Sequence, residues 1–390
     1  MGENAVEDHN PARRGGHPYP GGGVLVRPSR AVRRELVLLT LATVGAGLAI
    51  QLGSALAGHA TSDIPKLWFE RGIRPDAPPY LDRPLEYPPV IGLVMWATSW
   101  AGSRAGYLVV NAALLAPLAV VVTVLLERRV GSAARRWALG IPLALYAVHH
   151  WDLVAVAPAV AGLLAAEAGA TGVAGALFAV GASAKLYPAL FVPLVALTLL
   201  RSGRRQAAGG LVSWFSAGLV ALNLPVLLVA SQGWWDAIRF QGDRAASWGS
   251  LWFHLFRLPF VRDVLDPRAA GPANIASTVA LALGAAWLGT VVWRRGLGIV
   301  AIGTAATVLF VLVSKVYSPQ YDLWVLPAFA LLPIDRRLFV AFSAASLAMY
   351  LLVFGHGFGL VPRSALAECI GVVVLARAAV LCGVLRSATA

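Results

Sequence analysis

Charged side chains are scarce in this chain of 390 residues: Asp, Glu, Lys and Arg make up 13% of it, and hydrophobic residues make up 58%. Soluble domains contain about 25% charged residues. A soluble fold of this composition would need an implausibly large core for its surface, and runs of Leu, Val and Ala recur along the whole chain. The sequence therefore predicts an all-α, polytopic membrane protein.

Cysteines and nucleotide-binding motifs are nearly absent as well. The two cysteines, Cys369 and Cys382, fall in one predicted helix about 20 Å apart, which is too far for a disulfide bond. The chain has no Walker A motif and no Rossmann fingerprint, which excludes those two phosphate cradles, and we expect no cofactor. Residues 1–30 lack a short apolar core with a cleavage site, so no cleavable signal peptide is expected.

The basic residues are spread along the chain. A net charge of +13 gathered in one patch would be typical of nucleic-acid binding, but here it is divided among short clusters at helix ends, so no nucleic acid is expected. Such clusters orient membrane helices and mark their cytoplasmic ends. They comprise Arg27 to Arg34, Arg128 to Arg136, Arg201 to Arg205, Arg294 and Arg295, and Arg336 and Arg337. Residues 1–30 are rich in Gly and Pro and predict a disordered cytoplasmic tail.

The apolar runs of residues 31–390 predict one transmembrane domain of about twelve helices in the cell membrane. The charge rule favours a single crossing from about Arg104 to Glu127, which leaves Pro89–Trp100 as a short helix in the outer interface. Several later runs are shorter than the roughly 20 residues of a full span, so we expect half-helices buried in protein. Polar segments fall opposite the basic clusters, in outer loops of about residues 58–103 and 231–274.

Asp63, at the start of the first outer loop, is the candidate catalytic residue. A partly desolvated carboxylate at a helix exit suits a general base that takes a proton from an attacking hydroxyl. The alternative is an interfacial acid that only pairs with Lys66. Glu86, in Glu86-Tyr87-Pro88-Pro89, is a competing base or a substrate-binding residue together with Tyr87.

Two lysines at predicted outer helix ends are candidate phosphate ligands. Lys185 precedes Tyr187-Pro188, and Lys315 stands in the segment SKVYSPQY. A lysine beside an apolar run either extends its amine to the interface or pairs with an anion. Two such cations predict one region that binds a lipid phosphate. The adjacent Ser318, Gln320 and Tyr321 offer hydroxyl and amide groups for a sugar.

The second outer loop and one short turn complete the candidates. Arg244, Trp248 and His254 lie in an aromatic stretch that suits an interfacial helix covering a groove, although an aromatic belt that anchors the loop is the alternative. Adjacent histidines rarely place both rings on one ion. We therefore interpret His149-His150-Trp151-Asp152 as an interfacial turn and predict no metal site.

With these residues in place, the chain resembles the GT-C membrane glycosyltransferases, and among them the glycosyltransferase 87 family with its polyprenol-phosphate-mannose-dependent mannosyltransferases. The similarity spans about residues 35–335 and rests on four segments: SDI with Asp63, EYPP at Glu86–Pro89, AKLYPAL at Ala184–Leu190 and SKVYSPQYDLWVLP at Ser314–Pro327. The resemblance implies a GT-C-like domain with interfacial helices in the first outer loop. It also implies Asp63 as the base, a polyprenyl-phosphate donor carrying mannose, and an outer-face acceptor that is a lipid or a glycan.

The expected reaction is one displacement with inversion at the anomeric carbon. The lipid phosphate is a good leaving group, stabilised by Lys185, Lys315 and Arg244, so a single catalytic carboxylate suffices, unlike the pair in glycosidases. A transporter or flippase of lipid-linked sugars is the alternative function, but it would carry polar groups near the bilayer midplane and often repeated halves. Another donor sugar, such as arabinofuranose or glucose, stays open.

Overall fold

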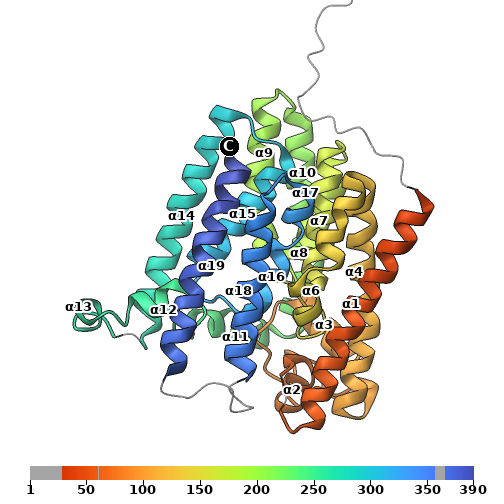
Figure 1. Ribbon diagram of the computed structural model, residues 1–390, viewed down its shortest axis with the longest axis vertical. Coiled ribbons are helices and arrows are strands. Elements are labelled where there is room, and N and C mark those ends of the chain that lie inside the picture. The colour runs from red at the N-terminus through yellow and green to blue at the C-terminus, as the bar shows by residue number, and fades with distance from the viewer. Residues whose placement is uncertain (1–28, 60, 267, 356–364) are drawn as a thin grey trace, which may run out of the picture.

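The computed structural model describes residues 29–59, 61–266, 268–355 and 365–390, and within them the chain is all-helical (Figure 1). The only β-type pairs in these residues are isolated bridges in the loop between residues 70 and 89, Arg74 with Ala77 and Pro79 with Arg83. Most of the predicted tail, residues 1–28, lies outside the described residues, and Arg30 already belongs to the first helix. The all-α prediction is thereby confirmed for the described chain.

The α-helices follow one another along the whole chain, with short 3-10 segments between some of them. They are α1 (Arg30–Leu56), α2 (Asp63–Glu70), α3 (Pro89–Ala97), α4 (Arg104–Val130), α5 (Arg135–Ala138), α6 (Ile141–Tyr146), α7 (Leu153–Glu167), α8 (Thr171–Ala182), α9 (Phe191–Arg201), α10 (Arg205–Val229), α11 (Ser231–Asp243), α12 (Leu251–Leu255), α13 (Pro259–Arg262), α14 (Ala270–Arg295), α15 (Ile299–Val313), α16 (Asp322–Val325), α17 (Ala328–Leu331), α18 (Arg336–Gly355) and α19 (Leu366–Thr389).

Six helices of the described chain are long and apolar enough to cross a membrane. They are α1, the continuous helix Arg104–Ala138 that contains α4 and α5, α10, α14, α18 and α19. The 27 residues of α4 make about 40 Å, more than the roughly 30 Å of a bilayer core. The chain is therefore a membrane-embedded helical protein.

The helices in the middle of the bundle are shorter. α7 and α15 have 15 residues each and α8 has 12, which makes about 18–22 Å. Most of their side chains are buried. A helix can stop inside a membrane protein only where its free backbone groups are shielded from lipid. The loop-end turns beside α7 and α8, residues 147–152 and 183–185, are buried, so both helices end inside the protein there, whereas residues 167–170 at their other ends are exposed.

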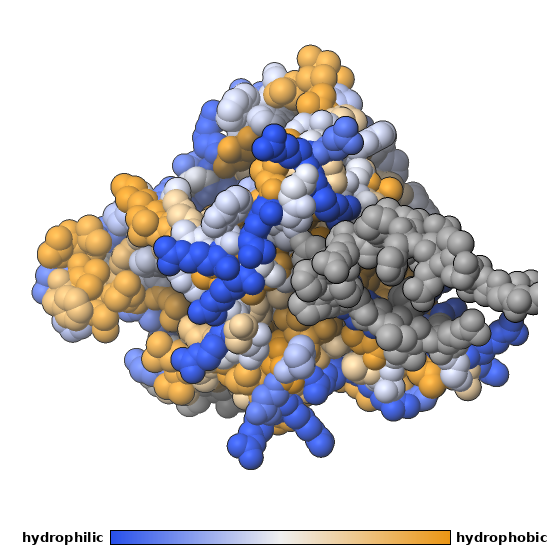
Figure 2. All heavy atoms as spheres, turned by 90° about the horizontal axis from the view of Figure 1, so that it is seen from above, coloured by the Kyte–Doolittle hydropathy of each residue, from blue (hydrophilic) through white to orange (hydrophobic). Residues whose placement is uncertain are grey.

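The basic helix ends gather at one end of the molecule, which we call the basic end. Ion pairs join Arg33 to Glu127 at 3.0 Å and Arg129 to Glu167 at 2.7 Å, and so bring the ends of α1, α4 and α7 together. Hydrophilic side chains spread across the middle of this face in Figure 2. The opposite end, the loop end, carries α2, α3 and α11 to α13 (Figure 1).

The predicted crossing from about Arg104 to Glu127 and the interfacial helix before it have counterparts in the structure. α4 begins at Arg104, as expected, and continues to Val130. The segment 89–100 folds as α3 and a 3-10 turn, Ser99–Ala101. Pro89 lies in the first turn of α3, where its missing N–H is tolerated. α2 was not predicted as a separate helix.

Close packing of α1 against α6 depends on one glycine. A Cβ built on Gly47 would overlap the carbonyl oxygen of Ala144, whereas a Cβ on Gly45, in the same helix, would meet nothing within 4 Å. Small residues allow such close backbone approach between membrane helices.

We expect Gly47→Ala to destabilise the protein by about 1–3 kcal/mol, because α1 has to move away from α6. Gly45→Ala is the matched control and should be neutral or stabilising by up to about 1 kcal/mol, because alanine favours the helix. Thermal unfolding of both variants in the same detergent measures the difference. Equal midpoints for the two variants would contradict this account of the α1–α6 contact.

Candidate functional site

A cavity of about 340 Å³ lies at the loop end, where breaks between helices meet. We call it the loop-end cavity. Its wall contains most of the site residues predicted from the sequence, namely Asp63, Glu86, Tyr87, Lys185, Arg244, Lys315, Ser318, Gln320 and Tyr321. These residues come from five separate parts of the chain. The fold thus brings two acids, Asp63 and Glu86, and three cations around a single space.

Asp63 is the first residue of α2, and its backbone is fixed against the turn between α6 and α7. Ser62 caps the helix, accepting a hydrogen bond from the Ile64 N–H at 3.2 Å. Its hydroxyl also lies 3.1 Å from the carbonyl oxygen of His149, which accepts from the Asp63 N–H at 3.0 Å. Asp63 is thereby held at the cavity wall.

The Asp63 carboxylate is accessible, with 34% of its side chain exposed. Its Oδ2 lies 3.8 Å from Nε2 of buried His149. Burial lowers the pKa of His149, which favours the neutral ring. Among the described residues no ion pair joins Asp63 to Lys66, so the predicted alternative partner is not in place. An accessible carboxylate beside a neutral imidazole can accept a proton from a bound hydroxyl.

Glu86 is committed to a structural contact. Both of its carboxylate oxygens accept hydrogen bonds from Arg71, at 2.9 Å each, and its backbone carbonyl accepts from the Gln241 side chain at 2.9 Å. Such a bidentate pair is strong and directional. Glu86 therefore joins the first outer loop to α11 at the cavity wall and is poorly suited to act as the base.

Lys185 lies in the turn after α8 with its amine in the cavity wall. Its Nζ is 3.9 Å from Oδ1 of Asp152 and 5.0 Å from the centre of the Tyr87 ring. Burial lowers the pKa of Lys185, and the charges of Asp152 and Asp63 oppose that effect. The lysine is almost buried, so an anion in the cavity would meet it with little intervening water.

Asp152 is fully buried under the cavity, and the sequence analysis did not select it. Its Oδ1 accepts from the Trp324 indole N–H at 2.6 Å, and its Oδ2 lies 3.2 Å from Nδ1 of His150. Burial raises the pKa of Asp152, but Lys185, His150 and Trp324 together outweigh burial and lower it. The turn that we interpreted as interfacial is therefore buried, because the flanking helices stop short inside the bundle.

His150 connects this buried acid to the cavity wall. Its Nε2 lies 3.0 Å from the Tyr87 hydroxyl, and either atom can donate. Tyr87 in turn forms part of the lining. Nδ1 of His150, the atom near Asp152, accepts from the Trp151 N–H at 2.7 Å, so His150 is fixed between the buried acid and Tyr87. The only sequence signal for this arrangement was two histidines and an acid in one turn.

Lys315 connects the loop after α15 to the segment at Gly242 and Arg244, at the wall of the cavity. Its Nζ donates to the carbonyl oxygens of Arg244 at 2.5 Å and Gly242 at 3.2 Å. Its own carbonyl accepts from the Ser247 N–H at 2.9 Å. Burial and the neighbouring Arg244 lower the pKa of Lys315. One of the three amine donors remains for a ligand.

A buried ion pair supports the segment that carries Ser318 and Gln320. Arg377, in α19, donates to Oδ1 of Asp322 at 2.6 Å, and the Tyr317 hydroxyl donates to the same oxygen at 2.6 Å. The guanidinium also lies 3.8 Å from the centre of the Tyr317 ring. Sequence reasoning missed Arg377, although a single arginine inside an apolar run is costly and marks such a contact.

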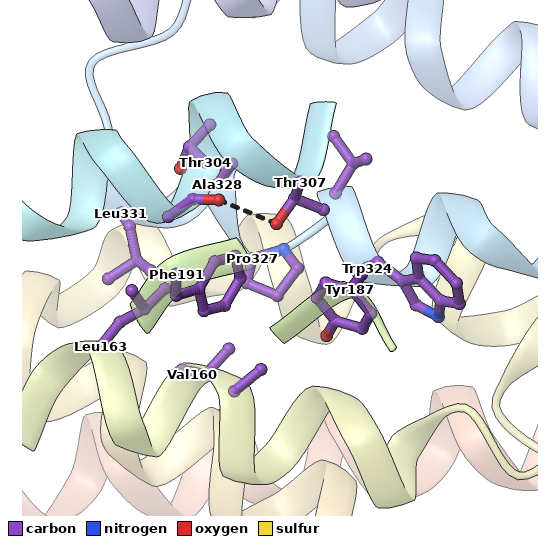
Figure 3. A pocket seen from close by; sticks show the side chains of 13 residues that line it. Val160, Leu163, Tyr187, Phe191, Thr304, Thr307, Trp324, Pro327, Ala328 and Leu331 are labelled. Carbon is purple, nitrogen blue, oxygen red and sulfur yellow. Dashed lines mark hydrogen bonds between the residues drawn. The ribbon is translucent and has the colours of Figure 1, made fainter. Parts of the chain in front are cut away.

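Three predicted residues do not line the loop-end cavity: Tyr187, Trp248 and His254. Tyr187 stacks on Trp324 at 4.4 Å and borders a separate small, mainly apolar cavity of about 30 Å³ (Figure 3). Trp248 packs beside a buried cluster formed by α18 and α19, and its carbonyl oxygen lies 2.9 Å from Nε2 of His254. Tyr187 is buried, whereas Trp248 and His254 are partly buried, and none of the three borders the loop-end cavity. Their predicted contact with substrate stays a prediction.

Comparisons with protein-family models, curated proteins and solved structures found no match for this chain. Within the described residues, no group of three or more His, Cys, Asp or Glu side chains is arranged to hold a metal ion. The geometry of the site is therefore the basis for the functional argument.

Replacing Asp152 by Ala should destabilise the protein by about 3–5 kcal/mol, because the Lys185 cation would stay buried without its partner. Asp236→Ala is the control: Asp236 pairs with Arg239 at the surface, at 3.1 Å, and its loss should cost less than about 1 kcal/mol. Thermal unfolding in detergent tests the pair. Similar losses in both variants would show that Asp152 does not compensate a buried charge.

Proposed function

We propose that the protein is a GT-C-type glycosyltransferase that moves a sugar, with mannose the expected one, from a polyprenyl phosphate to a lipid or glycan acceptor. The observation that carries the proposal is the loop-end cavity, in which Asp63 shares one space with Lys185, Arg244 and Lys315. Three cations suit the phosphate of the donor, and the carboxylate suits activation of the acceptor hydroxyl.

The proposed membrane arrangement has about twelve crossings in the cell membrane. The six long helices would be joined by six shorter crossings, namely α6, α7, α8, α9, α15, and α16 with α17. The gathering of basic helix ends at one end supports a cytoplasmic position for that end. The loop-end cavity would then open on the outer face.

In the proposed reaction, Asp63 accepts the proton of an acceptor hydroxyl as its oxygen forms a bond to the anomeric carbon. The bond from that carbon to the phosphate oxygen breaks, and the electron pair leaves with the phosphate. Lys185, Arg244 and Lys315 stabilise the negative charge that develops there. The displacement inverts the anomeric carbon and needs no general acid.

The sugar would lie against the segment after α15. Ser318 and Gln320 offer a hydroxyl and an amide at the wall, and Tyr321 stacks on Trp324 at 3.8 Å, which fixes the position of its hydroxyl. These groups are held by the buried contact of Tyr317 with Asp322. A preformed row of hydrogen-bonding groups favours one orientation of the sugar.

Asp63→Asn tests the base. We expect transfer from radiolabelled polyprenyl-phosphate mannose to fall by about 10²–10⁴-fold with the fold intact, because the amide cannot accept the proton. Asp236→Asn, on the surface of α11, should transfer at the normal rate. Membranes are assayed with mannose, arabinofuranose and glucose donors in parallel. Normal transfer by folded Asp63→Asn would remove Asp63 from the mechanism, and donor movement across the membrane without transfer would favour a flippase.

The lowered pKa of Lys185 predicts an alkaline limit to the reaction. Its charged form is required, and that charge is lost as the pH rises through a pKa that lies below the ordinary value of about 10.4. The kcat/KM for the donor should therefore fall on the alkaline side at a lower pH than an exposed lysine would give. Lys185→Arg should move this fall to higher pH, because arginine keeps its charge.

Lys315→Arg is the comparison for the pH profile, because burial also lowers the pKa of Lys315. If the alkaline fall in kcat/KM moves to higher pH only in Lys315→Arg, the alkaline limit belongs to Lys315. A profile that is unchanged in both variants would mean that neither lysine binds the phosphate as a cation.

A further inference from the structure

A second cavity, of about 690 Å³, lies between α1, α2 and α4 at the loop end. We call it the α1–α4 groove. Its apolar wall consists of Leu52, Ala55, Leu56, Ala105 and Leu108, from the loop-end parts of two long apolar helices. Pro65, Lys66, Phe69 and Glu70 of α2 close it on the other side. The α1–α4 groove shares no lining residue with the loop-end cavity.

Two cations stand in the wall of the α1–α4 groove. The Arg104 guanidinium carbon lies 3.8 Å from the centre of the Phe69 ring, so the ring holds the charge in place. Among the described residues neither Lys66 nor Arg104 forms an ion pair. Glu70 is the one carboxylate of the lining. The groove therefore keeps two positive charges for one negative charge.

This combination matches the chemistry of a phospholipid at a membrane surface. The phosphates of lipids lie where apolar helices end, and lysine and arginine residues near that level attract anionic lipids. The apolar side chains of α1 and α4 suit an acyl chain. Glu70 can accept hydrogen bonds from the hydroxyl groups of a headgroup. It would also attract the cation of a choline headgroup, but Lys66 and Arg104 would repel that cation.

We propose that the α1–α4 groove binds an anionic phospholipid with a hydroxyl-bearing headgroup, its phosphate between Lys66 and Arg104. A lipid in this position would contact α1, α2 and α4 together and so fasten α2 to the two long helices. Asp63 begins the same helix, and Lys66, three residues later, lies one helical turn away from it. The bound lipid therefore also holds the helix that presents Asp63 to the loop-end cavity. The proposal depends on the membrane embedding of the chain and not on sugar transfer.

Native mass spectrometry of the full chain in detergent, titrated with phosphatidylglycerol or phosphatidylcholine of equal acyl chains, tests the site. The wild type should bind phosphatidylglycerol more tightly. Each of Lys66→Ala and Arg104→Ala should weaken that binding about fivefold, and the double variant about 25-fold, with phosphatidylcholine binding unchanged. Lys66→Arg should keep the preference, because it retains the charge.

Arg257→Ala is the matched control, because the Arg257 guanidinium also lies 3.8 Å from a phenylalanine ring, that of Phe253, and Arg257 lies outside the groove. It should leave the lipid preference intact. Equal binding of both lipids by the wild type, or an undiminished preference in the double variant, would overturn the proposal. Tight binding of soluble glycerol phosphate, equal to that of the lipid, would overturn the role of the acyl chain.

Discussion

The rest of the structure depends on the need to hydrogen-bond every backbone group in a lipid environment. A helix exposed to lipid has to continue across the membrane, and six apolar helices of the described chain are long enough to do this. Helices such as α7, α8 and α15 can stop short only because they are buried among other helices. At the loop end these helices leave polar turns inside the bundle, and these turns form part of the wall of the loop-end cavity.

Charges in these turns are held by partners from distant parts of the chain. Asp152 pairs with Lys185, and Asp322 pairs with Arg377, in each case with almost no exposure of either side chain. A charge in such surroundings interacts more strongly than one in water, because the local dielectric constant is low. The Arg129–Glu167 pair at the basic end is partly exposed on both sides and contributes less to stability by comparison. The Asp152 pair therefore holds the Lys185 cation at the wall of the loop-end cavity, and the Asp322 pair holds the segment after α15 in place.

The short helix α2 has two different sides with separate chemistry. Its first residue, Asp63, lines the loop-end cavity, and its later residues Pro65, Lys66, Phe69 and Glu70 line the α1–α4 groove. Ser62 and the turn before α7 fix its beginning through three backbone contacts. Movement of this one helix would change both spaces at once, which makes α2 the element that couples the candidate base to the surrounding membrane.

Composition and charge pattern alone determined the helical membrane class, the grouping of basic helix ends and the place of Asp63, Lys185 and Lys315 in segments opposite those ends. These features depend on local hydrophobicity and helix length, which a sequence displays directly. The tertiary structure alone decided that Glu86 is occupied by Arg71, that Asp152 and Arg377 serve buried ion pairs, and that Trp248 faces α18 and α19. Such pairings depend on how separate helices pack and rotate against one another, and hydrophobic runs with equal apolarity on all sides do not specify that rotation.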